Sequence, residues 1–143
     1  MEIYKEVLDR IADAARRSCG REIGGILGAD RDGTVCRVVI DDAPSSDRYT
    51  YVPDVDRLNG ILARWEPHEF IGLFHTHPNN QRALSVGDRA YIGEIMRAMP
   101  PGKDRLCFPL YVLPEHKLYG YLAERDARHG ITVTQEPVHV ITV

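Results

Sequence analysis

The sequence has few cysteines, and their spacing forms no recognisable pattern. Cys19, Cys36 and Cys107 are odd in number, widely separated and without any Cys-x-x-Cys pair. Such usage is typical of a reducing compartment and argues against a disulfide framework or a cysteine-ligated zinc finger. No cysteine has the sequence context of a catalytic nucleophile, so a cysteine protease is disfavoured. We therefore expect a cytoplasmic protein with buried or incidental thiols.

Long hydrophobic runs and an excess of charge of one sign are also missing. The first 18 residues carry charges throughout, so they predict neither a signal peptide nor a transmembrane helix. Lys and Arg number 18 against 21 Asp and Glu, which gives a net charge of -3. Because both signs are mixed along the chain, nothing indicates binding to nucleic acid or to an anionic membrane.

What the sequence does contain is typical of one soluble domain. The 143 residues are 43% hydrophobic and 27% charged, and they are enough for a single domain, 1–143, with its own core. Helices are predicted over 2–18, 53–67 and 85–99, and strands over 22–28, 35–40, 49–52, 69–77, 107–113, 118–123, 131–135 and 138–143. Pro137 separates the last two strands and favours a sheet edge for them. This order predicts an α/β domain of three layers.

The segment from Phe70 to Asp88, FIGLFHTHPNNQRALSVGD, carries the functional signal. Side chains alternate along a strand, so His75 and His77 should point to the same side before Pro78 ends the strand. Ser85 is the expected N-cap of the next helix, which places Asp88 one turn inside it. Two imidazoles and one carboxylate make a three-ligand site with an open fourth position, which is typical of catalytic zinc.

Simpler interpretations of the same residues stay open. Ser85 and Asp88 also match a capping box, which would need no metal. The loop from Asn79 to Arg82 could be a mobile connection or a substrate contact. The remaining histidines lack ligand spacing and are expected on the surface: His68, His116, His129 and His139.

An acidic residue, Glu22, opens the glycine-rich segment EIGGILG upstream of these residues. Together, Glu22 and the pattern H-x-H-x7-S-x-x-D resemble the JAMM motif of the MPN (Mov34/PAD-1) metallopeptidases, in their stand-alone prokaryotic JAB-type branch. The resemblance implies an MPN-like (cytidine deaminase-like) fold with a mixed curved sheet flanked by helices. It also implies one zinc ion per chain on His75, His77 and Asp88, with a zinc-activated water. Glu22 would then be the general base, and Ser85 the donor to the developing oxyanion.

The function implied by this resemblance is hydrolysis of a peptide or isopeptide bond at the C-terminus of a ubiquitin-like modifier. Deconjugation, precursor processing and release of a C-terminal cysteine from a sulfur-carrier protein are all compatible with it. A non-catalytic MPN scaffold is the main alternative, although such relatives lose ligands that this chain retains. A DNA-repair relative lacks support because no basic surface is indicated. The resemblance also implies that 43–54 and 100–105 lie where eukaryotic members carry substrate-contacting insertions. Both segments are short here, which favours a smaller or simpler substrate over recognition of a specific lysine linkage. The oligomeric state stays open.

Overall fold

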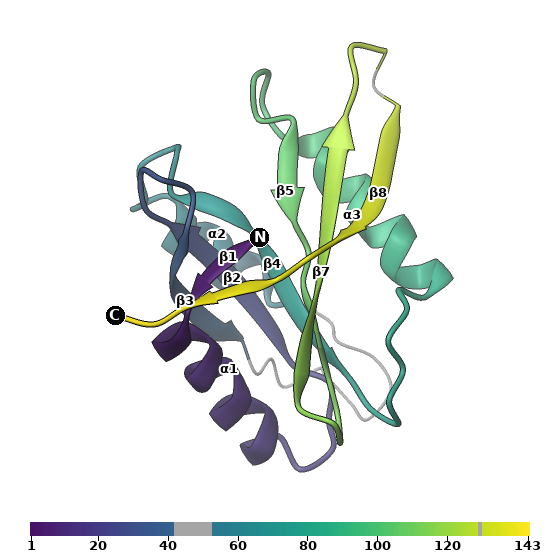
Figure 1. Cartoon of the computed structure of the whole chain (residues 1–143). Coiled ribbons are helices and arrows are strands. Elements are labelled where there is room, and N and C mark those ends of the chain that lie inside the picture. Colours follow the sequence, from purple (N-terminus) through teal and green to yellow (C-terminus); the bar gives the residue numbers. More distant parts are fainter. Residues whose placement is uncertain (42–52, 129) are drawn as a thin grey trace.

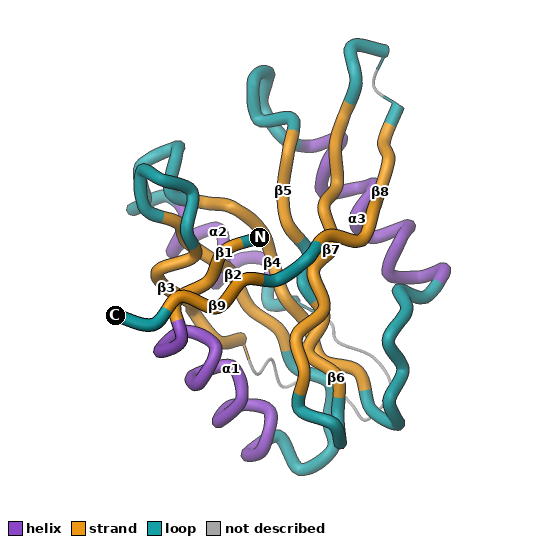
Figure 2. The backbone as a smooth tube through the Cα atoms, in the orientation of Figure 1, coloured by secondary structure: helices purple, strands orange, loops and turns teal. Residues whose placement is uncertain are grey.

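A computed structural model describes residues 1–41, 53–128 and 130–143 of the chain (Figures 1 and 2). The predicted strand at 49–52, most of the segment 43–54 and His129 lie outside the described residues. Within the described ranges, no helix is both long and apolar enough to cross a membrane.

One mixed sheet of nine strands forms the centre of the described structure. Its strands are β1 (Glu2–Tyr4), β2 (Gly24–Ala29), β3 (Val35–Asp41), β4 (Phe70–His77), β5 (Arg105–Cys107), β6 (Leu110–Val112), β7 (Lys117–Arg125), β8 (Ile131–Glu136) and β9 (His139–Ile141). Their order is β5-β7-β6-β4-β2-β3-β1-β9, and β8 pairs with β7. The central strand β4 is antiparallel to β2 and parallel to β6, so the sheet is mixed as expected.

Three helices cover the two faces of the sheet, which confirms the three-layer prediction (Figure 1). The helices are α1 (Lys5–Arg17), α2 (Val55–Leu62) and α3 (Val86–Ala98). Alternation along β2 sends Leu27 into the core under α1, with Val7 and Ile11. Its neighbour Ile26 enters the second core, which Leu58 of α2 and Ile92 and Met96 of α3 share.

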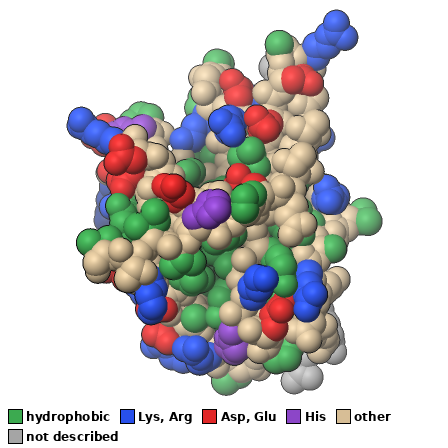
Figure 3. Space-filling model, in the orientation of Figure 1, with side chains coloured by type: hydrophobic (Ala, Val, Ile, Leu, Met, Phe, Trp, Pro, Cys, Tyr) green, Lys and Arg blue, Asp and Glu red, His purple; other side chains and the backbone are tan. Residues whose placement is uncertain are grey.

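The face of the molecule that carries α1 is hollowed between α1 and β7. Figure 3 shows hydrophobic side chains gathered in this hollow, between α1 and β7, with Lys, Arg, Asp and Glu around it. The β8–β9 segment crosses the same face above the hollow (Figure 2).

Several predicted boundaries are wrong for identifiable reasons. Residues 2–4 form β1 rather than the first helical turn, because Ile3 pairs with both Val35 and Val140. The predicted strand 107–113 is divided between β5 and β6, since Pro109 has no N–H group to continue the ladder. Helix α2 ends at Leu62, before Pro67. The edge position predicted around Pro137 is confirmed, with β8 on β7 and β9 on β1.

Glycines in the central strands allow neighbouring backbones to approach closely. A Cβ atom on Gly72 would overlap the carbonyl oxygen of Cys107, and one on Gly25 would overlap that of Val39. The glycine-rich character of β2 therefore has a packing reason.

Replacing Gly72 with alanine tests this close approach. We expect Gly72→Ala to lower the free energy of unfolding by about 3 kcal/mol, because β4 and β5 must separate to admit the methyl group. The matched variant is Gly60→Ala in α2, where an added Cβ meets nothing within 4 Å. It should raise stability by about 0.5–1 kcal/mol through helix propensity. Urea unfolding measures both; wild-type stability in Gly72→Ala would contradict the strand spacing.

Candidate metal centre

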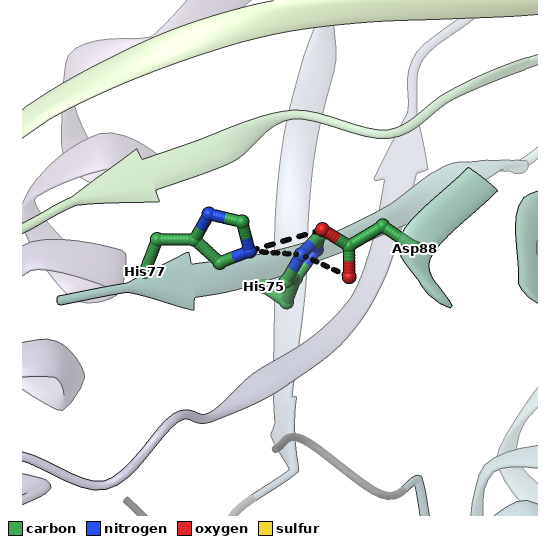
Figure 4. Close-up of side chains that lie close together, drawn as sticks. All are labelled: His75, His77 and Asp88. Carbon is green, nitrogen blue, oxygen red and sulfur yellow. Dashed lines mark hydrogen bonds and ion pairs between the residues drawn. The ribbon is translucent and has the colours of Figure 1, made fainter. Parts of the chain in front are cut away.

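The end of β4 positions two imidazoles side by side. His75 and His77 project to the same side of the strand, as the alternation predicts, and Pro78 follows the last strand residue. Their Nε2 atoms lie 3.2 Å apart, and the rings meet edge to face at 76°. Both nitrogens therefore point to one place (Figure 4).

The carboxylate of Asp88 approaches these nitrogens from the first turn of α3. Its Oδ1 lies 3.2 Å from His75 Nε2, and its Oδ2 lies 3.0 Å from His77 Nε2 (Figure 4). The three side chains can each offer one ligand atom, all within 4.8 Å of one another. Two imidazole nitrogens and one carboxylate oxygen suit a divalent cation such as zinc. The three residues therefore fit a metal.

The capping box is present in the same residues as the metal ligand. Ser85 Oγ accepts a hydrogen bond from the Asp88 backbone N–H at 3.0 Å, and Asp88 Oδ2 accepts one from the Ser85 N–H at 2.8 Å. The two interpretations of the S-x-x-D pattern are therefore compatible. The cap orients the Asp88 side chain, so that its carboxylate faces β4.

Electrostatics keep the Asp88 carboxylate ionised. Burial alone would raise its pKa, but hydrogen bonds from His75, His77 and the Ser85 backbone outweigh burial and hold the pKa well below its usual range. Burial would likewise lower the pKa of His77, yet the Asp88 charge and hydrogen bond raise it. At neutral pH, Asp88 is thus charged and able to act as a ligand.

A backbone carbonyl fixes the orientation of His77. The Nδ1 atom of His77 lies 3.1 Å from the carbonyl oxygen of Gln81. A carbonyl can only accept, so Nδ1 carries the proton and Nε2 is the nitrogen available to a metal. Carbonyl partners of this kind hold metal-binding histidines in many sites.

The β6–β7 hairpin holds the loop that provides this carbonyl. The Asn80 N–H donates to Leu113 O at 2.7 Å, and the Tyr121 hydroxyl donates to Arg82 O at 2.7 Å. Arg82 also pairs with Glu115 at 3.1 Å. Two members of the loop predicted at 79–82 are thus anchored through their main chain. A substrate contact by this loop stays a prediction. Sequence reasoning missed Tyr121 because it lies 39 residues from its partner.

Glu22 lies beside the three metal-ligand candidates. It lines a cavity of about 350 Å³ together with His75, His77, Ser85 and Asp88, and it is only 8% exposed. The rest of the cavity wall is formed by Leu73, Phe74, Gln81, Gly87, Tyr91, Ile92 and Phe108. The structure therefore brings all five residues singled out in the sequence to one cavity.

The position of Glu22 differs slightly from the prediction. Strand β2 begins at Gly24, so Glu22 precedes the strand instead of opening it. Its neighbour Ile23 is tied to β4 by two hydrogen bonds, from Ile23 N to Thr76 Oγ1 and from Thr76 N to Ile23 O, both 2.9 Å long. Thr76, which points away from the histidines, thus fixes the backbone beside Glu22.

The sheet topology and the His-His-Asp arrangement are those of a JAB/MPN-type domain. The family model described as prokaryotic homologs of the JAB domain matches residues 4–122, so the chain belongs to this family.

Two solved structures share the fold. The solution structure of protein DSY2949 from Desulfitobacterium hafniense is 20% identical, with a TM-score of 0.67 over 99% of this chain and 93% of that chain. The crystal structure of AF2198, a JAB1/MPN domain protein from Archaeoglobus fulgidus, is 14% identical, with a TM-score of 0.57 over 99% of both chains. No curated protein matches the chain at a significant level.

Substitutions at Asp88 separate its two roles. Asp88→Ala should lose zinc and also lower the stability of the metal-free protein by about 1 kcal/mol, because the side-chain half of the capping box is removed. Asp88→Asn keeps an acceptor oxygen for the cap and should lose zinc with a smaller change in stability. His75→Ala should lose zinc without weakening the cap. Zinc content after dialysis and urea unfolding measure the two effects; full zinc occupancy in His75→Ala or Asp88→Ala would refute the ligand assignment.

Removing the Tyr121 hydroxyl tests the support of His77 by its loop. Tyr121→Phe keeps the buried ring but releases Arg82 O, so the Gln81 carbonyl beside it is held less firmly. We expect zinc affinity to fall about threefold to tenfold. This loss is at or below the low end of the losses seen when residues that hydrogen-bond to a metal ligand are replaced, because Tyr121 acts on His77 only through the loop. Competition with a chromophoric chelator measures this affinity. Tyr4→Phe, which removes a hydroxyl bonded to Asp30, is the control; an unchanged affinity in Tyr121→Phe would show that the loop holds itself.

Proposed function

We propose that this protein is a zinc-dependent metallopeptidase that hydrolyses a peptide or isopeptide bond at the C-terminus of a ubiquitin-like protein. The observation that carries the proposal is the meeting of Glu22, Ser85 and the His75, His77 and Asp88 side chains at one cavity. A structural metal site would need neither an additional buried carboxylate nor a hydroxyl beside it.

Each of these residues has a part in hydrolysis. When bound, zinc supplies a Lewis acid and lowers the pKa of water to about 7. Glu22, whose carboxyl group is buried beside the ligands, accepts the proton of the attacking water and delivers it to the nitrogen of the leaving amine as the C–N bond breaks. The Ser85 oxygen accepts from the Asp88 N–H, which leaves its own proton available for the carbonyl oxygen as negative charge develops there.

The conformation of the loop after α3 favours processing at a C-terminus over recognition of a particular lysine linkage. The Arg125 guanidinium donates to the carbonyl oxygens of Met96, Met99 and Pro100 at 2.8–3.0 Å, and it also pairs with Asp104 at 2.9 Å. The loop is therefore folded against the end of β7. Precursor trimming and release of a C-terminal cysteine both require only the tail of a ubiquitin-like partner, which we propose to meet this enzyme in the cytoplasm.

An intact-mass cleavage assay tests the proposal. Three ubiquitin-like substrates are compared, with and without a chelator: one with a linear C-terminal extension, one with a single terminal cysteine and one with a lysine isopeptide bond. We expect chelator-sensitive cleavage of at least one, and the linear substrates should be preferred.

Glu22→Gln is the matched variant for this assay. It should keep zinc and lose turnover by a factor of about 100 or more, because the proton acceptor is removed. Wild-type turnover in Glu22→Gln would exclude this residue as the general base. If the zinc-loaded wild-type protein cleaves none of the three substrates, the non-catalytic scaffold is favoured instead.

A further inference from the structure

Tyr91 is a polar side chain of the cavity wall that has no part in the proposed chemistry. It lies on α3, three residues after Asp88, so that both side chains project from one face of the helix. The side chain is half-buried, and Tyr91 lines the cavity together with Ile92.

Tyr91 lines the cavity, and its hydroxyl is a potential hydrogen-bond donor. No described residue forms a hydrogen bond with it, and the described residues include no fully buried side-chain nitrogen or oxygen without a partner. The hydroxyl must therefore be accessible. Burial and the nearby charge of Asp41 raise the pKa of Tyr91 to about 12, so the group stays protonated at neutral pH.

A peptide that enters this cavity needs such a donor. Its main-chain carbonyl groups lose water on binding, and each one left without a donor weakens the complex. The acidic side chains of the cavity, Glu22 and Asp88, can only accept when ionised. Ser85 is assigned to the carbonyl at the scissile bond. Gln81 also lines the cavity but is exposed, so the half-buried Tyr91 hydroxyl is the more enclosed donor for another carbonyl.

The geometry of α3 indicates which carbonyl this is. Tyr91 lies six positions after Ser85. At about 1.5 Å per residue, this spacing is a rise of about 9 Å along the helix axis. An extended peptide advances about 3.3 Å per residue, so this distance corresponds to two or three residues. Ser85 and Tyr91 both line the α3 side of the cavity, and Glu22 precedes β2. With the roles proposed for Ser85 and Glu22, the acyl carbonyl would lie on the α3 side and the leaving amine near Glu22.

We propose that the Tyr91 hydroxyl donates a hydrogen bond to a main-chain carbonyl two or three residues on the acyl side of the scissile bond. Tyr91 is thus a specificity-determining residue that selects an extended tail, and this role rests on the proposed peptidase function. The bond forms equally in the bound substrate and in the transition state. Its loss should therefore raise KM and leave kcat nearly unchanged.

Peptide binding to an inactive protein tests the assignment without turnover. The zinc-loaded Glu22→Gln protein is titrated, by NMR, with acetyl-Leu-Arg-Gly-Gly and with unacetylated Gly-Gly, which has no carbonyl two residues before its terminal one. Adding Tyr91→Phe should weaken binding of the tetrapeptide about threefold to tenfold, the value of one hydrogen bond. The dipeptide is too short to reach the hydroxyl, and its affinity should change less than about twofold.

Tyr4→Phe in the same background is the control, because its hydroxyl bonds to Asp30 away from the cavity. Equal tetrapeptide affinity with and without Tyr91→Phe would overturn the inference. So would equal losses for both peptides, or no measurable tetrapeptide binding to the Glu22→Gln protein. The cleavage assay on wild-type protein judges the proposed function separately: cleavage together with an unchanged KM in Tyr91→Phe would remove Tyr91 and leave the peptidase assignment standing.

Discussion

The contact between the first turn of α3 and the end of β4 is the constraint on which the candidate site depends. A single carboxylate, that of Asp88, makes this contact. Its Oδ1 faces His75, while its Oδ2 faces His77 and accepts the Ser85 N–H. Because the same group caps the helix and faces both imidazoles, the start of α3 and the metal centre are fixed together. A shift of the helix by one residue would break the cap and remove the carboxylate from the histidines.

The β6–β7 hairpin stabilises the candidate site, whose side chains come from β4 and α3. Parallel pairing places Leu110 beside His75 and Val112 beside His77, so the β6–β7 hairpin lies next to the metal centre. From there, Leu113 O and the Tyr121 hydroxyl hold the loop after β4 at two points. The orientation of His77 therefore depends on residues about 40 positions later in the chain. This dependence explains why a site with local ligands still requires the complete sheet.

The meeting of the three metal-ligand candidates was predictable because their geometry is local. A strand that stops at Pro78 and a capped helix soon after it fix His75, His77 and Asp88 within 14 residues. The three layers followed from the order of periodic segments. Residues 2–4 were misassigned because the buried spacing of Ile3, Val7 and Ile11 fits a helix, and pairing with two distant strands decides otherwise. The Gln81 carbonyl could not be predicted, since a main-chain group leaves no signal in residue type. Tyr91 could have been found from the sequence, because a residue three positions after Asp88 lies on the same face of the predicted helix.

Substrate choice in this fold depends on the balance between donors and acceptors in the cavity. In the proposed peptidase, the carboxylates of Glu22 and Asp88 and imidazole nitrogens directed at a metal offer no proton to a peptide carbonyl. The hydroxyls proposed as donors, those of Ser85 and Tyr91, lie at the start of α3 and in its second turn. Arg125 holds the loop after α3 against the end of β7. Discrimination between substrates should therefore depend more on the tail that crosses the cavity than on the surface of the protein that carries it.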